Sequence, residues 1–182
     1  MLILGLDPGT RIVGYGLVEV AGSRLRLVAA GVLRAPATLP VEQRLARIAK
    51  GLAQIVADHR PGVAAMEDAF VRDDPRAALV VGEGRGALLA VLGEHGIPVL
   101  SYPPASVKRA VAGNGRAGKE QVARMVAAIL GASGPRGPLD ATDALAVAIA
   151  HSLKSKARST ILEADDGRGK APVRRDTRAV GP

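Results

Sequence analysis

A short apolar segment near the N-terminus ends on a carboxylate, and this feature constrains the fold more than any other. Residues 2–7 read LILGLD, and Pro8-Gly9 follows at once. Branched apolar residues are typical of a buried strand, whereas Asp-Pro-Gly is typical of a turn. In α/β sheets, ligands bind at the carboxyl ends of strands. Asp7 is therefore a candidate site residue, although an acid before Pro-Gly is also an ordinary turn residue.

Apolar periodicity predicts an α/β fold with a sheet of about five strands flanked by helices. We expect strands at 2–7, 12–20, 25–34, 62–67 and 97–102, and helices at 41–58, 76–94, 104–112, 119–131 and 140–153. The first three strands are joined by tight turns, which predicts an antiparallel start. The later strands alternate with helices, which predicts parallel pairing.

A second acid ends another predicted strand, GVAAME at 62–67. If this strand returns through the 41–58 helix to lie parallel to the first, Asp7 and Glu67 lie side by side. Glu67 alone could be only the first solvated residue after a strand. Two like charges at neighbouring strand ends repel each other unless a proton or a cation lies between them.

A third acidic element is LDATDALAVAIAHS at 139–152. Asp140 and Asp143 are three residues apart, so both lie on one face of a helix, in its first turn. Acids at this position also cap a helix without any catalytic role. The rest of the helix is so apolar that it must be buried, which fixes the position of its acidic start.

Composition limits the chemistry that these acids can perform. The 182 residues include no cysteine and only three histidines, which excludes thiolate ligands and cysteine nucleophiles. Four carboxylates are typical of a Mg²⁺ site with two ions, for which Mn²⁺ can substitute, and such ions can hydrolyse a phosphodiester. The net charge of +8 favours a polyanionic partner, above all nucleic acid.

The chain divides into a folded domain at 1–155 and a basic tail at 156–182, which we expect to be disordered. From Lys154 onward, eight basic residues stand against four acidic ones, and apolar periodicity stops after Leu162. No signal peptide or uncharged membrane-spanning stretch is evident, which predicts no membrane association and a cytoplasmic location.

Four segments, in order, resemble the RuvC family of Holliday junction resolvases: ILGLDPGTRIVGYGLV, AAMEDAFVRDDPRAALVVGEGRGALL, YPPASVKRAVAGNGRAGKEQV and LDATDALAVAIAHS. The resemblance covers residues 2 to about 155. It implies an RNase H-like fold, a homodimer that nicks four-way DNA junctions symmetrically, and partnership with the RuvA and RuvB branch-migration proteins. It also implies that Asp7, Glu67, Asp140 and Asp143 are the catalytic metal ligands, with 5′-phosphate and 3′-hydroxyl products.

Aromatic and basic residues near these segments are candidate DNA contacts. Phe70 could stack on a base or, alternatively, fill space under its loop. Basic side chains are suited to phosphates, although each one could be a plain solvated charge. The predicted DNA-binding residues are Phe70, Arg76, Arg85, Lys108, Arg109, Arg116 and Lys119.

Other features of the 76–94 helix concern assembly and specificity. Glycines four apart in a helix favour a close backbone neighbour, which predicts a dimer interface; it comprises Gly82, Gly84 and Gly86 with Leu79, Leu88 and Leu89. Asp68 and Glu83 stand where the resemblance leads us to expect glutamine, and either could alter metal affinity or sequence preference.

Three alternatives to a nuclease agree less well with the sequence. A non-catalytic junction-binding protein would gain nothing from four acids facing phosphate. LGLDPGT also resembles a phosphate loop of actin-like ATPases, but those need two such domains. GNGRAGKE at 113–120 ends in Glu120 where a P-loop needs Ser or Thr, and it follows a predicted helix rather than a strand.

Overall fold

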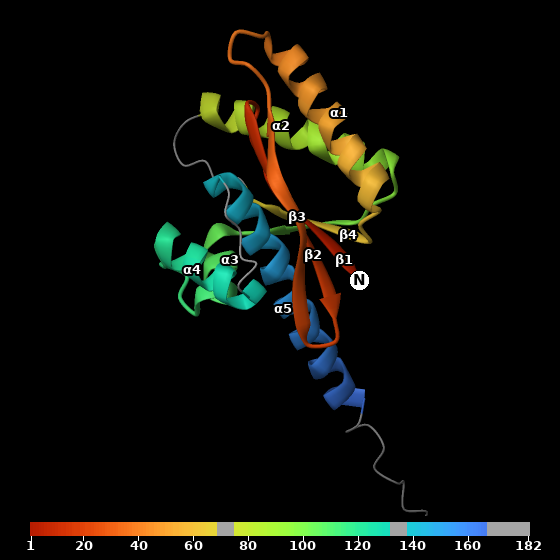
Figure 1. Ribbon diagram of the computed structural model, residues 1–182, viewed down its shortest axis with the longest axis vertical. Coiled ribbons are helices and arrows are strands. Elements are labelled where there is room, and N and C mark those ends of the chain that lie inside the picture. Colours follow the sequence, from red (N-terminus) through yellow and green to blue (C-terminus); the bar gives the residue numbers. More distant parts are fainter. Residues whose placement is uncertain (69–74, 132–137, 167–182) are drawn as a thin grey trace, which may run out of the picture.

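A five-stranded mixed sheet forms the centre of this computed structural model, which describes residues 1–68, 75–131 and 138–166 (Figure 1). Across the sheet the strands are β3 (Arg24–Arg34), β2 (Ile12–Ala21), β1 (Leu2–Asp7), β4 (Val63–Glu67) and β5 (Val99–Tyr102). The β1–β2 and β2–β3 pairs are antiparallel, whereas β1–β4 and β4–β5 are parallel. The predicted fold class and the predicted change of strand direction are confirmed.

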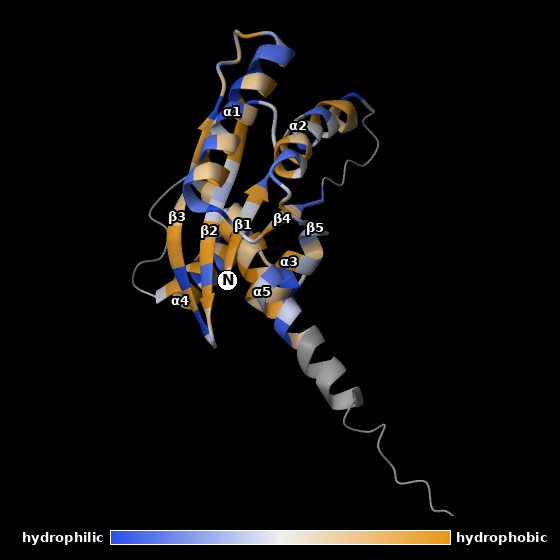
Figure 2. Cartoon of the chain, turned by 90° about the vertical axis from the view of Figure 1, so that its right-hand side faces the viewer, coloured by the Kyte–Doolittle hydropathy of each residue, from blue (hydrophilic) through white to orange (hydrophobic). Residues whose placement is uncertain are grey.

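Five helices cover the two faces of the sheet. Helices α1 (Val41–His59) and α2 (Pro75–Glu94) pack on one face. Helices α3 (Pro104–Ala112), α4 (Lys119–Leu130) and α5 (Leu139–Asp166) pack on the other. Figure 2 shows strands that are largely hydrophobic, and hydrophilic and hydrophobic residues that alternate along α1. This alternation is what a helix with one buried face requires.

The two-residue period of the strands determines which side chains face α5. In β1, Leu4 and Leu6 belong to the core under α1 and α2, whereas Ile3 belongs to the core under α5. In β4, Met66 lies under α1 and α2, whereas Ala65 lies under α5. Because side chains alternate, the terminal acids of both strands are on the α5 face.

The backbone of helix α5 packs so closely on the sheet that only glycine fits at the strand positions beneath it. A Cβ atom added to Gly5 would lie 1.9 Å from the carbonyl oxygen of Ala144, and one added to Gly14 would lie 1.9 Å from that of Asp140. A Cβ atom on Gly16 would lie 2.6 Å from the side chain of Leu145. The positions of Gly14 and Gly16 in an otherwise apolar strand are the sequence signal of this approach.

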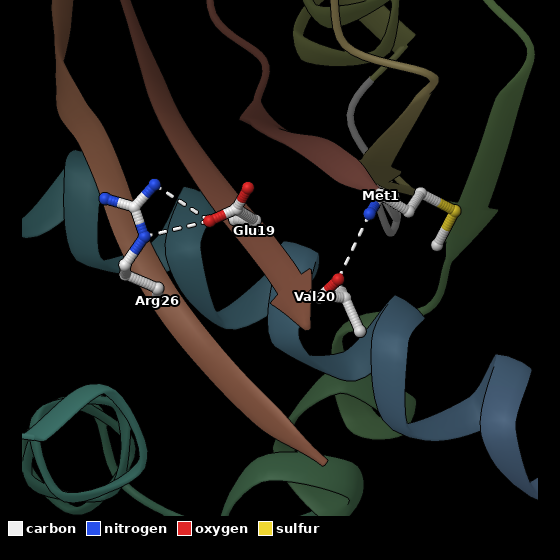
Figure 3. A network of polar contacts seen from close by, with 4 residues as sticks. All are labelled: Met1, Glu19, Val20 and Arg26. Atoms are coloured by element: carbon white, nitrogen blue, oxygen red, sulfur yellow. Dashed lines mark hydrogen bonds and ion pairs between the residues drawn. The ribbon is translucent and has the colours of Figure 1, made fainter. Parts of the chain in front are cut away.

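Polar contacts fix the strand register at the end of β1 that is remote from Asp7 (Figure 3). The amino group of Met1 donates to the carbonyl oxygen of Val20 at 3.1 Å. In the β2–β3 pair, Glu19 lies opposite Arg26, whose Nε donates to the Glu19 carboxylate at 2.8 Å. Such an exposed ion pair adds little stability but favours one register.

Element boundaries differ from the expected ones mainly at α5. The expected helix end at 153 and the expected domain boundary after 155 both fall inside α5, which continues to Asp166. Residues 156–166 contain good helix formers, and extending an existing helix needs no new nucleation. The expected tail therefore begins as helix, and residues 167–182 lie outside the described part. Strand β5 begins at Val99 instead of Ile97 because Pro98 has no N–H to donate.

Candidate active site

Asp7 and Glu67 lie at adjacent strand ends, as expected. Leu6 of β1 is in register with Met66 of β4, so the acids that follow each residue are neighbours at the carboxyl edge of a parallel pair. Both side chains are partly buried. The placement results from two buried strands ending at the same level, each on an acid.

The third and fourth acids come from the start of α5. Asp140 and Asp143 are partly buried, while the residues between and after them are buried in the core. Gly14, which admits the backbone of Asp140, is the β2 partner of Asp7. The close packing of α5 on β2 thus brings the helix start to the end of β1.

Three of the four acids line one cavity of about 240 Å³. Its charged lining consists of three acids and two lysines: Asp7, Glu67, Asp143, Lys108 and Lys119. Apolar residues from α3, α4 and α5 complete the wall. Asp140 is not part of this lining, so it lies at the margin of the site.

Electrostatic interactions show that the acids act on one another. Burial, followed by the charges of Glu67, Asp143 and Asp140, raises the pKa of Asp7 from 3.8 to about 7. Burial and the charge of Asp143 likewise raise the pKa of Glu67. Burial is also the main cause that raises the pKa of Asp143. A site that raises three carboxyl pKa values in this way favours a bound cation or a proton.

Two lysines partly offset this negative charge. Lys119 Nζ lies 4.0 Å from Asp143 Oδ2, and the charge of Lys119 lowers the pKa values of Asp7, Glu67 and Asp143. Lys108 acts in the same direction on Glu67 and Asp143. Lys119 is the first residue of α4, where the helix dipole disfavours a cation. Its position is therefore better explained by the acidic cavity than by helix stability.

The donor set fits a hard divalent cation in its chemistry. In the part of the chain that the structure describes, no three His, Cys, Asp or Glu side chains are close enough together to hold a metal by themselves. Mg²⁺ does not require such a cage, because it keeps several waters and is usually bound by one or two carboxylates plus substrate phosphate. Asp7, Glu67 and Asp143 around one cavity satisfy that requirement.

The remaining predicted DNA contacts differ in their exposure, and one of them falls outside the described residues. Arg76, Arg109 and Arg116 are exposed, and Lys108 is partly buried. Asn114 accepts a hydrogen bond from the backbone N–H of Arg116 at 3.0 Å and so shapes the turn between α3 and α4. Phe70 falls outside the described residues.

The segment GNGRAGKE connects α3 to α4, so it follows a helix and is not the strand–loop–helix of a P-loop.

The guanidinium of Arg85, another predicted DNA contact, donates to the protein at the ends of β4 and β5. Nη1 lies 3.2 Å from the carbonyl oxygen of Glu67, and Nη2 contacts Ser101 Oγ and lies 3.4 Å from Asp68 Oδ1. Sequence reasoning missed these contacts, because no periodicity relates α2 to the ends of β4 and β5.

Together, the sheet order and the acids at the ends of β1 and β4 and at the start of α5 define a domain of the RNase H-like class. Residues 3–151 match the family described as crossover junction endodeoxyribonuclease RuvC. This chain belongs to that RuvC family.

Curated relatives and solved structures agree with this assignment. The chain is 48% identical over 151 residues to the crossover junction endodeoxyribonuclease RuvC of Anaeromyxobacter dehalogenans, covering 83% of this chain and 80% of that protein. It is similar to Thermus thermophilus RuvC in complex with Holliday junction substrate, with a TM-score of 0.81, 36% identity and coverage of 87% and 97%. The yeast mitochondrial Holliday junction resolvase shares the fold at 18% identity, with a TM-score of 0.62 and coverage of 88% and 83%.

Proposed function

We propose that this protein is a metal-dependent endonuclease that resolves four-way DNA junctions by paired, symmetric nicks. The observation that carries the proposal is the cavity in which Asp7, Glu67 and Asp143 meet two lysines. Membership of the RuvC family supplies the reaction class, and a similar protein has been solved with a Holliday junction substrate. An enzyme with this activity would act in DNA recombination and repair.

Asp7, Glu67, Asp140 and Asp143 are the proposed metal-binding and catalytic residues. These acids would hold Mg²⁺, or Mn²⁺ in its place, which would supply an activated water and charge stabilisation for hydrolysis of the phosphodiester to 5′-phosphate and 3′-hydroxyl ends. Burial and then neighbouring carboxylates raise the pKa values of Asp7 and Glu67, and bound cations would stabilise the ionised form of both acids. Lys108 and Lys119 lie where they can attract and orient the phosphate group.

Basic residues of α3, of α4 and of the turn between them are proposed to bind the DNA backbone. Lys108 and Arg109 are on α3, Lys119 begins α4, and Arg116 lies between these helices. All four lie between residues 108 and 119, and Lys108 and Lys119 line the cavity together with the acids. Arg76, at the start of α2, and Phe70, which falls outside the described residues, are further proposed DNA contacts.

Helix α2 is proposed to form a homodimer interface. Leu79, Val80 and Leu89 are exposed to 65%, 44% and 38%. Among the described residues, nothing lies within 4 Å of a Cβ atom built on Gly82 or Gly86. Leu88 and Gly84, which were expected at the interface, instead pack inside the protomer, because Leu88 is in the core and Gly84 contacts Gly9. Light scattering at micromolar protein should give the mass of a dimer, and a monomer mass would contradict this proposal.

Partnership with RuvA and RuvB and a cytoplasmic location are proposed from the family resemblance. Within the described residues, no helix combines the length and apolar character that a membrane crossing requires.

Incubation of the purified protein with a synthetic four-way junction, and in parallel with linear duplex, tests the function. Each substrate is combined with Mg²⁺, Mn²⁺ or EDTA. We expect metal-dependent nicks in opposite arms of the junction only. Asp7→Asn should bind the junction and not cut it. Tight binding without nicks in either metal would instead identify a junction-binding protein, and normal cutting by Asp7→Asn would overturn the assignment of Asp7.

A further inference from the structure

Arg85 makes three contacts at the end of β4, the strand that carries Glu67. Its guanidinium donates to the Glu67 carbonyl oxygen at 3.2 Å and contacts Ser101 Oγ of β5. It also forms an ion pair with Asp68 at 3.4 Å. Met66 is in register with Ser101, so Arg85 bridges two adjacent strands at their carboxyl ends.

Exposure and donor geometry distinguish Arg85 from a surface phosphate ligand. Its side chain is 23% exposed, compared with 74% for Lys119, which lines the active-site cavity. A guanidinium has five N–H donors in a fixed planar fork. Three protein oxygen atoms, one near Nη1 and two near Nη2, define the orientation of this fork.

The neighbouring residue Gly84 extends the same contact to the other acid-bearing strand. A Cβ atom on Gly84 would lie 2.9 Å from the carbonyl oxygen of Gly9, in the turn that follows Asp7. Gly84 is buried and part of α2. One helix therefore contacts the chain next to Asp7 through Gly84 and the chain at Glu67 through Arg85.

We propose that Arg85 is a positioning residue for the active site, which fixes the backbone at Glu67 and is itself oriented by Asp68. This inference rests on the proposed nuclease function. Holding the Glu67 backbone sets where its carboxylate enters the cavity, and small errors in such placement reduce rates strongly. Asp68 takes part through its carboxylate, of which Oδ1 lies 3.4 Å from Nη2 of Arg85. A glutamine at 68, which the family resemblance leads us to expect, offers a carbonyl oxygen that could accept a hydrogen bond from the same guanidinium.

Single-turnover cleavage and junction binding in EDTA, measured side by side for Arg85 and Asp68 variants, test this role. We expect Arg85→Ala and Arg85→Lys to slow cleavage about 10-fold to 100-fold. Their junction affinity and the salt dependence of binding should equal those of the wild type. We expect Asp68→Ala to slow cleavage and Asp68→Gln to restore it, which a general loss of stability would not produce.

Arg109→Ala provides the comparison for a phosphate contact, because Arg109 is exposed on α3. If Arg85 contacted phosphate, Arg85→Ala would weaken binding and reduce the salt slope by about 1, and Arg85→Lys would retain much of the binding. That result would overturn the proposal, as would unchanged cleavage in Arg85→Lys or equal rates in the two Asp68 variants. The proposed nuclease function is tested independently of Arg85, by cleavage of the junction by the wild type and loss of cleavage in Asp7→Asn.

Discussion

The backbone carbonyl of Asp140 occupies the space where a side chain of Gly14 would lie. A Cβ atom at Gly14 would be only 1.9 Å from that oxygen. Gly14 is also the β2 partner of Asp7. One glycine therefore sets the distance between the strand that ends in Asp7 and the helix that carries Asp140 in its first turn.

Gly14→Ala should reduce both stability and cleavage. The added methyl group cannot fit unless the start of α5 or strand β2 moves, which moves Asp140 and Asp143 relative to Asp7. We expect a loss of about 1 to 3 kcal/mol in the free energy of unfolding, measured in urea. Cleavage by the fraction that remains folded should also fall.

Gly93→Ala is the matched control for that substitution. Gly93 is exposed near the end of α2, and among the described residues nothing lies within 4 Å of a Cβ atom built there. Alanine favours helix by up to about 1 kcal/mol over glycine. The control should therefore unfold no more easily than wild type and cut normally. Equal behaviour of Gly14→Ala and Gly93→Ala would contradict the packing argument.

Asp7→Asn should stabilise the metal-free protein at alkaline pH. The folded-state pKa of Asp7 is raised from 3.8 to about 7, so the folded state binds a proton more tightly than the unfolded state does. The destabilisation by the ionised carboxylate is absent below pH 3.8, grows as the pH rises, and is complete above about 7.

Urea unfolding in EDTA at a series of pH values tests whether Asp7→Asn is more stable than wild type at high pH. One pKa unit corresponds to about 1.4 kcal/mol, and solvent screening of a partly exposed group reduces the full effect. We expect Asp7→Asn to exceed wild type by about 1 to 3 kcal/mol at pH 8. The difference should shrink toward pH 4. A difference that does not change with pH would contradict the predicted cause.

Divalent cations should stabilise the wild type through the acidic site. Binding to the folded state alone raises stability by about 2.7 kcal/mol at 100 times the dissociation constant. We expect the melting temperature to rise with Mg²⁺ or Mn²⁺ and to return on addition of EDTA. Asp7→Asn should show a much smaller rise, and an equal rise in both proteins would place the stabilising ion elsewhere.

Lys119→Gln should move the acidic limb of the cleavage pH profile to higher pH. The positive charge of Lys119 lowers the pKa values of Asp7, Glu67 and Asp143, so its removal raises them. More alkaline conditions are then needed to ionise the acids.

Arg124→Gln is the control on the same helix for Lys119→Gln. Arg124 is as exposed as Lys119, at 74%, but it pairs with Glu120 instead of a site acid. Its pH profile should match that of the wild type. A shift of equal size in both variants would indicate a general effect of net charge.

Much of the site could be predicted because it depends on local patterns. Asp7 and Glu67 each end a short apolar run, and the helix between these runs requires a parallel return beside β1. Asp143 was found because its spacing from Asp140 is helical and the helix that follows is apolar.

Contacts between distant segments could not be predicted in the same way. In the sequence, Arg85 is a basic residue that could contact DNA. Only the packing of α2 near the ends of β4 and β5 brings it to Asp68 and Ser101. The length of α5 was also underestimated, because helix extension past 155 depends on propagation from the buried segment rather than on apolar periodicity.

The small residues of α5 have an implication for how this protein can evolve or be engineered. Ala144 and Ala148 lie against Gly5, and Leu145 lies against Gly16, so a larger residue at either alanine would lift the helix from the sheet. Asp140 and Asp143 would move with it. Substitutions that improve the interior of an ordinary domain would here alter the chemistry at its edge. Adaptation to heat or to a new substrate must therefore occur at positions away from the α5–sheet contact.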